Sequence, residues 1–202
     1  MWHCKKVLLL IGLLFAAGAY AQNIDIDILK AINPRYPDAK VWRVTSGSVD
    51  WISGGVPLAV LAYGYIEKNK TIRNNGYELI IAMAINAGIT QVMKVGFNRT
   101  RPSDAYPNDV FVRSVSHDKS FPSGHTSQAF ALATTLTLQY HRWYVSLPAY
   151  LYAGCVGYSR MYLGKHYPTD VLAGAAVGAG SSWLSHIISN KLFRRKKNNP
   201  QE

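Results

Sequence analysis

The stretch that decides the fold spans residues 121–130 and reads FPSGHTSQAF. Pro122, Ser123 and Gly124 are turn residues, and the small and apolar residues behind them predict a helix that begins at this turn. His125 stands in the first helical turn. A helix N-terminus offers free N–H groups and the positive end of the helix dipole, and both attract an anion. The turn is therefore either a helix cap made by Ser123 or an anion site with a proton donor beside it.

The chain around this turn is dominated by stretches that lack Asp, Glu, Lys and Arg. They cover residues 51–66, 79–93, 126–140, 143–159 and 171–190. None shows the period-two alternation of a strand, so we expect an all-α helical bundle. Most are shorter than the roughly 20 apolar residues of a membrane span. We expect a membrane-embedded bundle with about five spans after a signal peptide, or six if that segment is retained, and the alternative is a soluble periplasmic bundle.

The N-terminus has the pattern of a signal peptide. Lys5 and Lys6 precede the apolar run VLLLIGLLFAA, and small residues end the segment at Ala21. Such a segment directs export across a bacterial inner membrane. The expected organisation is a signal peptide at 1–21, an exported amphipathic lead-in at 22–50, a helical domain at 51–190 and a basic C-terminal tail at 191–202.

The charge balance narrows the class of partner. The formal net charge is +11, with 22 Lys and Arg against 11 Asp and Glu. Such a balance suits anionic lipids or phosphorylated substrates. The basic residues form no stripe interleaved with aromatic side chains, which argues against nucleic acid. No HxH, HExxH or paired-carboxylate pattern occurs, so we expect neither a metal nor a cofactor.

Three polar clusters interrupt the apolar stretches. They read KVGFNRTRP at residues 94–102, PSGH at 122–125 and SRMYLGKHYPTD at 159–170. The first two flank the loop of residues 95–121. The helices expected at 126–140 and 143–159 run out and back, which returns the third cluster to the same end of the bundle. We therefore expect all three clusters to meet.

The meeting point would hold three cations, Lys94, Arg101 and Arg160. Each cation near an anion contributes about 4 kcal/mol at an effective dielectric constant near 20. The planar fork of arginine matches two phosphate oxygens. The Ser123 hydroxyl and the N–H groups around Gly124 add donors, and glycine lets an anion approach the backbone closely. The pattern predicts a pocket for a dianion such as phosphate.

Two histidines would complete the chemistry. His166 has Asp170 four residues later, and a carboxylate that accepts the Nδ1 proton leaves Nε2 free as a nucleophile. His125 is placed to protonate a leaving oxygen. Arg99 and Lys165 are expected to be exposed cations that add only positive potential.

The three clusters resemble the signature motifs of the type 2 phosphatidic acid phosphatase superfamily, which read K-x6-R-P, P-S-G-H and S-R-x5-H-x3-D. Every fixed position is matched, in the same order and with the same internal spacing, and the resemblance covers about residues 50–190. It implies that His166 is the nucleophile, Asp170 its orienting partner and His125 the general acid. The phosphate-binding residues that it implies are Lys94, Arg101, Ser123, Gly124 and Arg160.

The expected activity is the metal-independent hydrolysis of a phosphomonoester or diphosphate through a phosphohistidine. The favoured substrate is a phosphorylated membrane lipid, and the favoured location is the inner membrane with the site facing the periplasm. One alternative is a soluble periplasmic acid phosphatase of broad specificity. Another is a vanadate-dependent haloperoxidase, because the superfamily's pocket binds vanadate as it binds phosphate. The sequence leaves the leaving group and the oligomeric state open.

Overall fold

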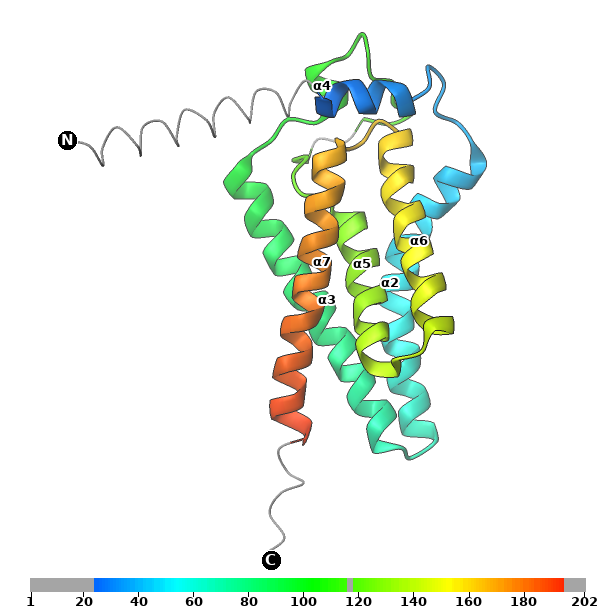
Figure 1. Ribbon diagram of the computed structural model, residues 1–202, viewed down its shortest axis with the longest axis vertical. Helices are drawn as coiled ribbons and strands as arrows, with labels where there is room; N and C mark the ends of the chain where they lie inside the picture. The colour runs from blue at the N-terminus through cyan, green and yellow to red at the C-terminus, as the bar shows by residue number, and fades with distance from the viewer. Residues whose placement is uncertain (1–23, 116–117, 195–202) are drawn as a thin grey trace, which may run out of the picture.

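The computed structural model describes residues 24–115 and 118–194, and over these residues it is all-helical. The expected signal peptide and the end of the basic tail lie outside the described residues. Five long helices run side by side along the molecule (Figure 1). After a first helix over residues 24–32, the elements are α2 (Lys40–Ile66), α3 (Lys70–Phe97), α4 (Pro102–Ala105), α5 (Gly124–Tyr140), α6 (Trp143–Tyr162), α7 (Pro168–Ser189) and the π-helix η1 (Asn190–Arg194). The expected all-α bundle is confirmed.

The helix ends follow local capping chemistry. Asn69 caps α3, because its side chain accepts hydrogen bonds from the N–H groups of Thr71 and Ile72 at 3.0 and 3.2 Å. Asn98 ends α3 in the left-handed conformation. Pro168 opens α7, where it costs no hydrogen bond. The chain therefore turns sharply at both ends of the bundle, and the loops at one of these ends carry the polar motifs.

The central helix is α5, which contacts α2, α3, α6 and α7. Its contact with α7 is close because α7 carries glycines on the shared face. A Cβ atom at Gly174 would lie 2.6 Å from the backbone oxygen of Ser123. Deeper in the bundle, Thr135 of α5 donates a hydrogen bond to Ser182 of α7 at 2.9 Å. Small residues and paired hydroxyls of this kind are how helices associate in membranes.

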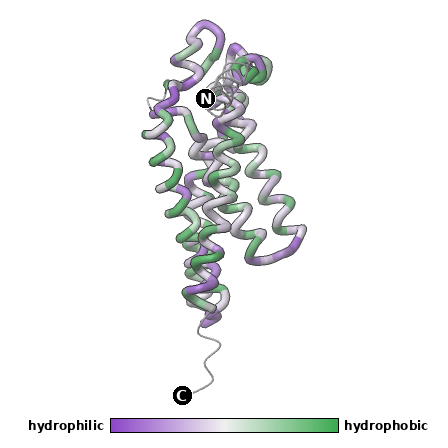
Figure 2. Tube along the Cα trace, turned by 60° about the vertical axis from the view of Figure 1, so that its left-hand side comes forward, coloured by the Kyte–Doolittle hydropathy of each residue, from purple (hydrophilic) through white to green (hydrophobic). Residues whose placement is uncertain are grey.

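The outer surface of the bundle is apolar. Side chains that are more than half exposed include Trp51 and Leu58 of α2, Val92 of α3, Leu151 of α6 and Trp183 of α7. Hydrophilic residues gather toward the helix ends, and apolar residues follow the helices between them (Figure 2). An exposed apolar belt around an interior of small polar residues is the arrangement expected in lipid.

Three helical segments of the described chain are long and apolar enough to cross a membrane, and they cover Lys40–Ile66, Lys70–Ala105 and Pro168–Phe193. With 17 residues, α5 is shorter than a typical span, and α6 is not among the three segments. The expected count of about five spans therefore stays a prediction.

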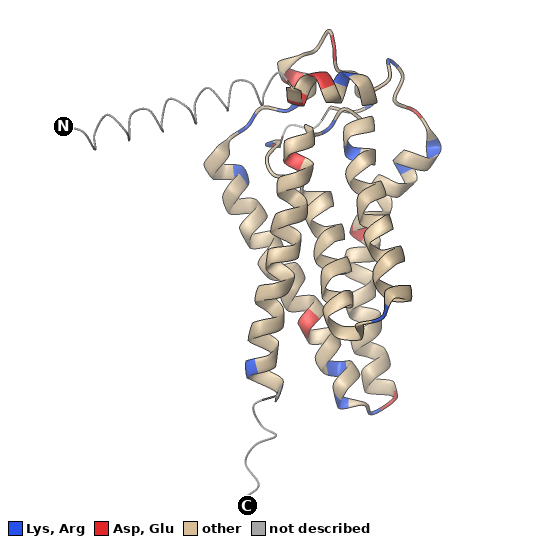
Figure 3. Ribbon diagram, viewed as in Figure 1, with Lys and Arg blue, Asp and Glu red and all other residues tan. Residues whose placement is uncertain are grey.

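Two features distinguish the end of the bundle that holds the three motifs. The helix over residues 24–32 lies across this end (Figure 1), and charged residues concentrate here and at the opposite end (Figure 3). In addition, α2 begins at Lys40 and runs through the boundary that the sequence suggested at residue 50. Part of the segment expected to be a lead-in therefore belongs to the bundle. We call this end, which holds the three motifs, the site end, and the opposite one the far end.

Candidate active site

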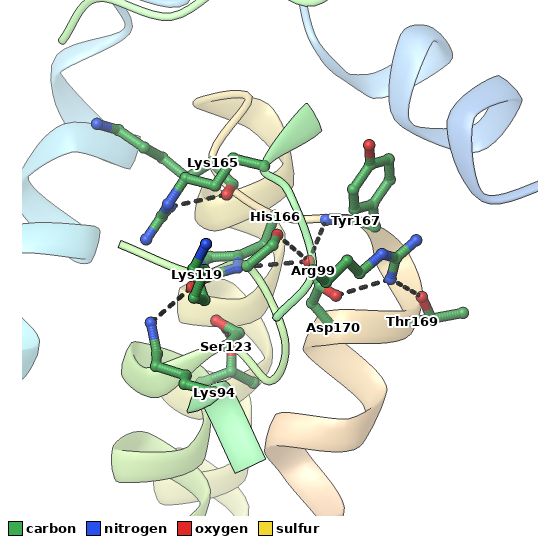
Figure 4. A network of polar contacts seen from close by, with 12 residues as sticks. Lys94, Arg99, Lys119, Ser123, Lys165, His166, Tyr167, Thr169 and Asp170 are labelled. Carbon is green, nitrogen blue, oxygen red and sulfur yellow. Dashed lines mark hydrogen bonds and ion pairs between the residues drawn. The ribbon is translucent and has the colours of Figure 1, made fainter. Parts of the chain in front are cut away.

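The three polar clusters converge at the site end, as the connectivity predicted. The backbone N–H of Ser123, at the start of α5, donates a hydrogen bond to the backbone oxygen of Asp170 at 2.9 Å. Arg101 donates through Nη1 to the backbone oxygen of Lys165, next to His166, at 2.9 Å. Figure 4 shows side chains from all three clusters around one small volume.

His166 lies in the loop between α6 and α7 and is buried, with 1% of its surface exposed. Burial lowers the pKa of its imidazole to about 3; the charges of Arg160 and Arg101 act in the same direction, against the pull of Asp170. His166 is therefore neutral near pH 7, which is the state that a nucleophile needs. Its Nδ1 faces Asp170 Oδ2 at 3.5 Å, a separation longer than a good hydrogen bond.

Asp170 stands in the first turn of α7 and is completely buried. Its Oδ2 accepts hydrogen bonds from the Ser120 hydroxyl at 2.5 Å and from the backbone N–H of Tyr167 at 3.0 Å. Its Oδ1 accepts from Arg99 Nη1 at 2.7 Å. Donors thus hold both carboxylate oxygens. This fixes the orientation of the carboxylate next to His166.

The expected cations are present, and two of them are nearly buried. Arg101 and Arg160 are only 4% and 7% exposed. Arg160 Nη1 donates to the hydroxyl of Ser46 on α2 at 2.6 Å, whereas its buried Nε has no hydrogen-bond partner among the described residues. A buried donor without a partner is costly, so this position suits an anion that brings acceptors.

Asp118 is the carboxylate that forms ion pairs with Lys94 and Arg101. Its side chain pairs with Lys94 Nζ at 2.6 Å and with Arg101 Nη2 at 2.5 Å, and it is 56% exposed. Burial, followed by the charges of Arg160 and Arg101, lowers the pKa of the Lys165 amine. The site therefore carries more positive charge than its own carboxylates neutralise.

The start of α5 keeps its first N–H groups available. Ser123 occupies the N-cap position, but its side chain makes no capping bond and instead pairs with the Thr126 hydroxyl at 2.9 Å. The simple cap that the turn first suggested is therefore absent. A Cβ at Gly124 would meet only Thr90, at 3.9 Å, so packing does not demand glycine here. A ligand that approaches the backbone would demand it.

His125 occupies the more open side of the site. Its side chain is 30% exposed, and its Nε2 lies 3.9 Å from Asp50 Oδ2 on α2. That carboxylate belongs to the segment the sequence had assigned to the lead-in. Burial, followed by the charge of Arg160, lowers the pKa of this imidazole to about 4, and a bound phosphate dianion favours its protonated form.

Sequence reasoning missed three side chains of this network. Arg99 was expected to be an exposed cation, and this was wrong: it is 24% exposed and pairs with Asp170. Ser120 is fully buried against the same carboxylate. Asp25 pairs with Arg99 Nη2 at 2.7 Å. The position of Arg99 between two expected site cations was a usable signal, whereas nothing near Asp25 pointed to a residue so distant in sequence.

Within residues 24–115 and 118–194, no group of three or more His, Cys, Asp and Glu side chains could hold a metal ion. The arrangement supplies a buried neutral histidine, an oriented carboxylate, a second histidine at the open edge and a set of cations. These parts can bind and transfer a phosphoryl group without a metal.

Comparison with known proteins finds relatives that are phosphatases of membrane lipids. The chain is 34% identical to a lipid A 1-phosphatase of Porphyromonas gingivalis over 90% of its own length, although it spans only 38% of that relative. It is 26% identical to a putative undecaprenyl-diphosphatase, YbjG, of Escherichia coli, with 86% of this chain and 89% of the relative covered.

A solved structure supports the fold and the setting. The transmembrane PAP2-type phosphatidylglycerolphosphate phosphatase of Bacillus subtilis superposes with a TM-score of 0.68 at 27% identity, over 93% of this chain and 97% of that one. This likeness and the apolar outer surface indicate a membrane protein. The PAP2 superfamily profile matches residues 76–194, a range that contains all three motifs, and the chain therefore belongs to the PAP2 superfamily.

Proposed function

We propose that this protein is a metal-independent phosphatase that hydrolyses a phosphomonoester or diphosphate of a membrane lipid through a phosphohistidine. One observation carries the proposal: neutral, buried His166 lies between oriented Asp170 and a cluster of cations at the uncapped start of α5.

In the first step, a phosphate dianion binds to Lys94, Arg101, Arg160 and the N–H groups at the start of α5. It displaces the Asp118 carboxylate from two of these cations, which is feasible because that carboxylate is half-exposed. The cations neutralise the charge of the phosphoryl group while the bond to phosphorus changes. Binding also supplies acceptors to the unpaired Nε of Arg160.

In the second step, Nε2 of His166 attacks phosphorus and the ester oxygen leaves with a proton from His125. The imidazole becomes positively charged as the P–N bond forms, and Asp170 stabilises this charge through Nδ1. Water then attacks the phosphohistidine, gives its proton to His125 and releases inorganic phosphate and free His166. Atoms and protons balance over the cycle, and no metal or redox partner takes part.

The proposed substrate is a lipid because the site lies at one end of a bundle with an apolar outer surface. A headgroup phosphate at the membrane surface can reach this end while its acyl or isoprenyl chains stay in the bilayer. Relatives named for lipid A, undecaprenyl diphosphate and phosphatidylglycerophosphate support the same class. The contacts described in the site are common to all three headgroups, because each presents a phosphate.

We further propose that the site faces the periplasm. The far end of the described chain carries Lys68, Lys70, Arg73, Arg142 and Lys191. Juxtamembrane cations favour the cytoplasmic side, which supports a site on the opposite side, although the site end carries at least as many Lys and Arg residues. The expected export signal at the N-terminus is consistent with this orientation.

The test of the proposed function uses the purified full-length protein in detergent. Phosphate release is measured from lipid A, undecaprenyl diphosphate and phosphatidylglycerophosphate, with EDTA present throughout. We expect turnover of at least one lipid, inhibition by vanadate, and a phosphohistidine that is trapped by alkaline quenching. A strict requirement for added metal would overturn the mechanism. Halide oxidation in the presence of vanadate would instead identify the haloperoxidase alternative.

The role of His125 has its own test. His125→Ala should lose most activity on an alkyl phosphate, whose leaving oxygen needs a proton. It should lose far less on p-nitrophenyl phosphate, whose leaving group departs without one. Equal losses on both substrates would remove His125 from the role of general acid.

A further inference from the structure

We propose that Asp25 and Arg99 form a positioning pair that holds Asp170 in the orientation that His166 requires. The helix over residues 24–32 is then a working part of the active site rather than a lead-in. The inference rests on the proposed function, because it assigns Asp170 to the support of a nucleophile.

Arg99 connects the first helix of the described chain to α7. Its Nη1 donates to Asp170 Oδ1 and to the Thr169 hydroxyl, both at 2.7 Å, and its Nη2 donates to Asp25 Oδ2 at 2.7 Å. Figure 4 shows the guanidinium reaching Asp170 and Thr169. The guanidinium also lies over the Tyr167 ring, 3.9 Å from its centroid. A planar group held by three acceptors and one ring has little freedom to move.

Asp25 holds the same turn from the other side. It is 3% exposed, and its Oδ1 accepts a hydrogen bond from the backbone N–H of Thr169 at 2.9 Å. Its Oδ2 accepts from the Thr169 hydroxyl at 2.5 Å. Asp25 thus binds both Arg99 and the residue that precedes Asp170. A change at Asp25 is therefore transmitted to the carboxylate through two separate contacts.

The orientation of Asp170 depends on this support. A carboxylate rotates about one bond, so a donor on one oxygen also fixes the other oxygen. Arg99 holds Oδ1, while Oδ2 faces His166 Nδ1 at 3.5 Å and accepts from Ser120. Without Arg99, Oδ1 loses its charged donor, and only the Ser120 hydroxyl and the Tyr167 N–H, both on Oδ2, still hold the carboxylate. Nδ1 of His166 would then face a less firmly held negative charge when the imidazole becomes positive.

The charges of the pair explain why both members are needed. Arg99 alone would neutralise Asp170 and weaken its attraction for the positive imidazole. Asp25 balances the guanidinium, so the three groups together carry one negative charge, the same as Asp170 alone. The pair therefore orients the carboxylate without cancelling it.

The first helix is docked by apolar contacts as well, which makes conservative variants informative. Ile26 and Leu29 are buried in a cluster with Val110 and Tyr167. Asn33 donates through Nδ2 to the backbone oxygens of Phe111 and Tyr162 at 2.9 and 2.8 Å. Loss of the Asp25 charge should therefore leave the helix in place.

The experiment compares Arg99→Met, Arg99→Lys, Asp25→Asn and a matched control, Lys30→Gln, in the full-length protein. Lys30 lies on the same helix and pairs with Asp109 at 2.8 Å. For each variant, kcat, KM and Tm are measured on the lipid that wild type hydrolyses best.

Arg99→Met should lower kcat about 100-fold with KM changed by less than about 3-fold, because the damage is to the reacting geometry. Arg99→Lys should restore part of the loss, since it returns the charge without the fork. Asp25→Asn should cost about 10-fold in kcat. Lys30→Gln should stay within about 2-fold of wild type.

A double variant tests the charge balance. Asp25→Asn combined with Arg99→Met should be no worse than Arg99→Met alone, because Asp25 acts through Arg99. Additive losses would overturn this coupling. Wild-type kcat in Arg99→Met, or an equal loss in Lys30→Gln accompanied by a lower Tm, would overturn the positioning role. An inactive wild type would refute the proposed function instead, so the two failures are distinguishable.

Discussion

Two histidine–carboxylate pairs lie near opposite ends of α7. At the site end, His166 Nδ1 faces Asp170 at 3.5 Å, and toward the far end, His186 Nδ1 meets Glu78 Oε1 at 2.7 Å. Both carboxylates are buried. The far pair has the shorter contact, so hydrogen-bond length alone would favour it over the proposed catalytic pair.

The surroundings separate the two pairs. Beside His166 stand Arg101, Arg160 and the uncapped start of α5. Beside Glu78, the Ser185 hydroxyl donates to its backbone oxygen at 2.8 Å, and within the described residues its carboxylate pairs with His186. A histidine paired with a buried carboxylate is thus compatible with a structural role. Phosphoryl chemistry also needs groups that bind an anion.

The largest expected difference between the pairs is in turnover. His166→Asn should lower kcat by about 10⁴-fold or more, because it removes the nucleophile. His186→Asn should leave kcat within about 2-fold, because it alters a contact at the far end. Phosphate release from the preferred lipid measures both.

Vanadate binding provides the control for this comparison. The His166→Asn variant keeps the cations and the start of α5, so vanadate should still protect it against thermal unfolding. Appreciable turnover by His166→Asn would refute the nucleophile assignment. A comparable loss in His186→Asn would show that the far pair contributes to catalysis.

The second expected difference is between activity and stability. Asp170→Asn should lower kcat by about 10³- to 10⁴-fold, because the amide cannot stabilise the positive imidazole. Glu78→Ala should instead lower the free energy of unfolding by about 1–3 kcal/mol, since it leaves partly buried His186 without its partner.

Chemical denaturation in detergent, together with kcat per folded molecule, separates these two effects. If Glu78→Ala lost activity while retaining its stability, the proposed division between the ends of α7 would be wrong.

Most of the candidate site could be predicted from the sequence, because its polar residues lie in three short motifs. Charge-free helices between the motifs determine their convergence, and the predicted convergence is confirmed by the contacts of Ser123 and Arg101. Roles within the site stay predictions, because geometry alone does not demonstrate catalysis. Arg99 was misjudged because burial of a cation depends on partners that a local pattern does not reveal.

The fold was predictable as a class and less so in its boundaries. Absence of strand periodicity indicated helices, and the structure is all-helical over the described residues. The first stretch without Asp, Glu, Lys and Arg predicted that the bundle starts at residue 51, whereas α2 starts at Lys40. The first part of α2 contains charged and polar residues such as Arg43, Ser46 and Asp50. It is a helix end at the site, where Ser46 contacts Arg160 and Asp50 lies near His125.

A smaller difference is expected between two glycines of α7. A Cβ at Gly174 would lie 2.6 Å from the Ser123 oxygen, and one at Gly178 would press on the backbone of Ser127 and Ala131, one to two turns further along α5. Gly174→Ala should displace the turn at the start of α5 and reduce kcat about 10-fold. Gly178→Ala should mainly cost stability, by about 1–3 kcal/mol.

Gly154→Ala on α6 serves as the matched control, because a Cβ there would meet no atom within 4 Å. Its kcat and Tm should match those of wild type. The interpretation would fail if Gly178→Ala reduced kcat per folded molecule more than Gly174→Ala did.

The smallest expected effect is a pH dependence of stability that arises from His166. Its pKa is about 3 in the folded protein, below the ordinary value of 6.5, because burial disfavours the charged imidazole. Between these two values the unfolded chain binds the proton and the folded protein does not. The stabilising contribution is therefore complete above pH 6.5 and is lost progressively as the pH falls toward 3.

The measurement is the free energy of unfolding of wild type and His166→Asn at pH 7, 6 and 5. The wild-type value should fall relative to the variant below pH 6.5, with a slope that approaches about 1.4 kcal/mol per pH unit for one proton. Parallel curves would mean that the imidazole takes up its proton equally easily in both states. His166 would then be solvated in the folded protein, and it would no longer differ from His125 in its access to solvent.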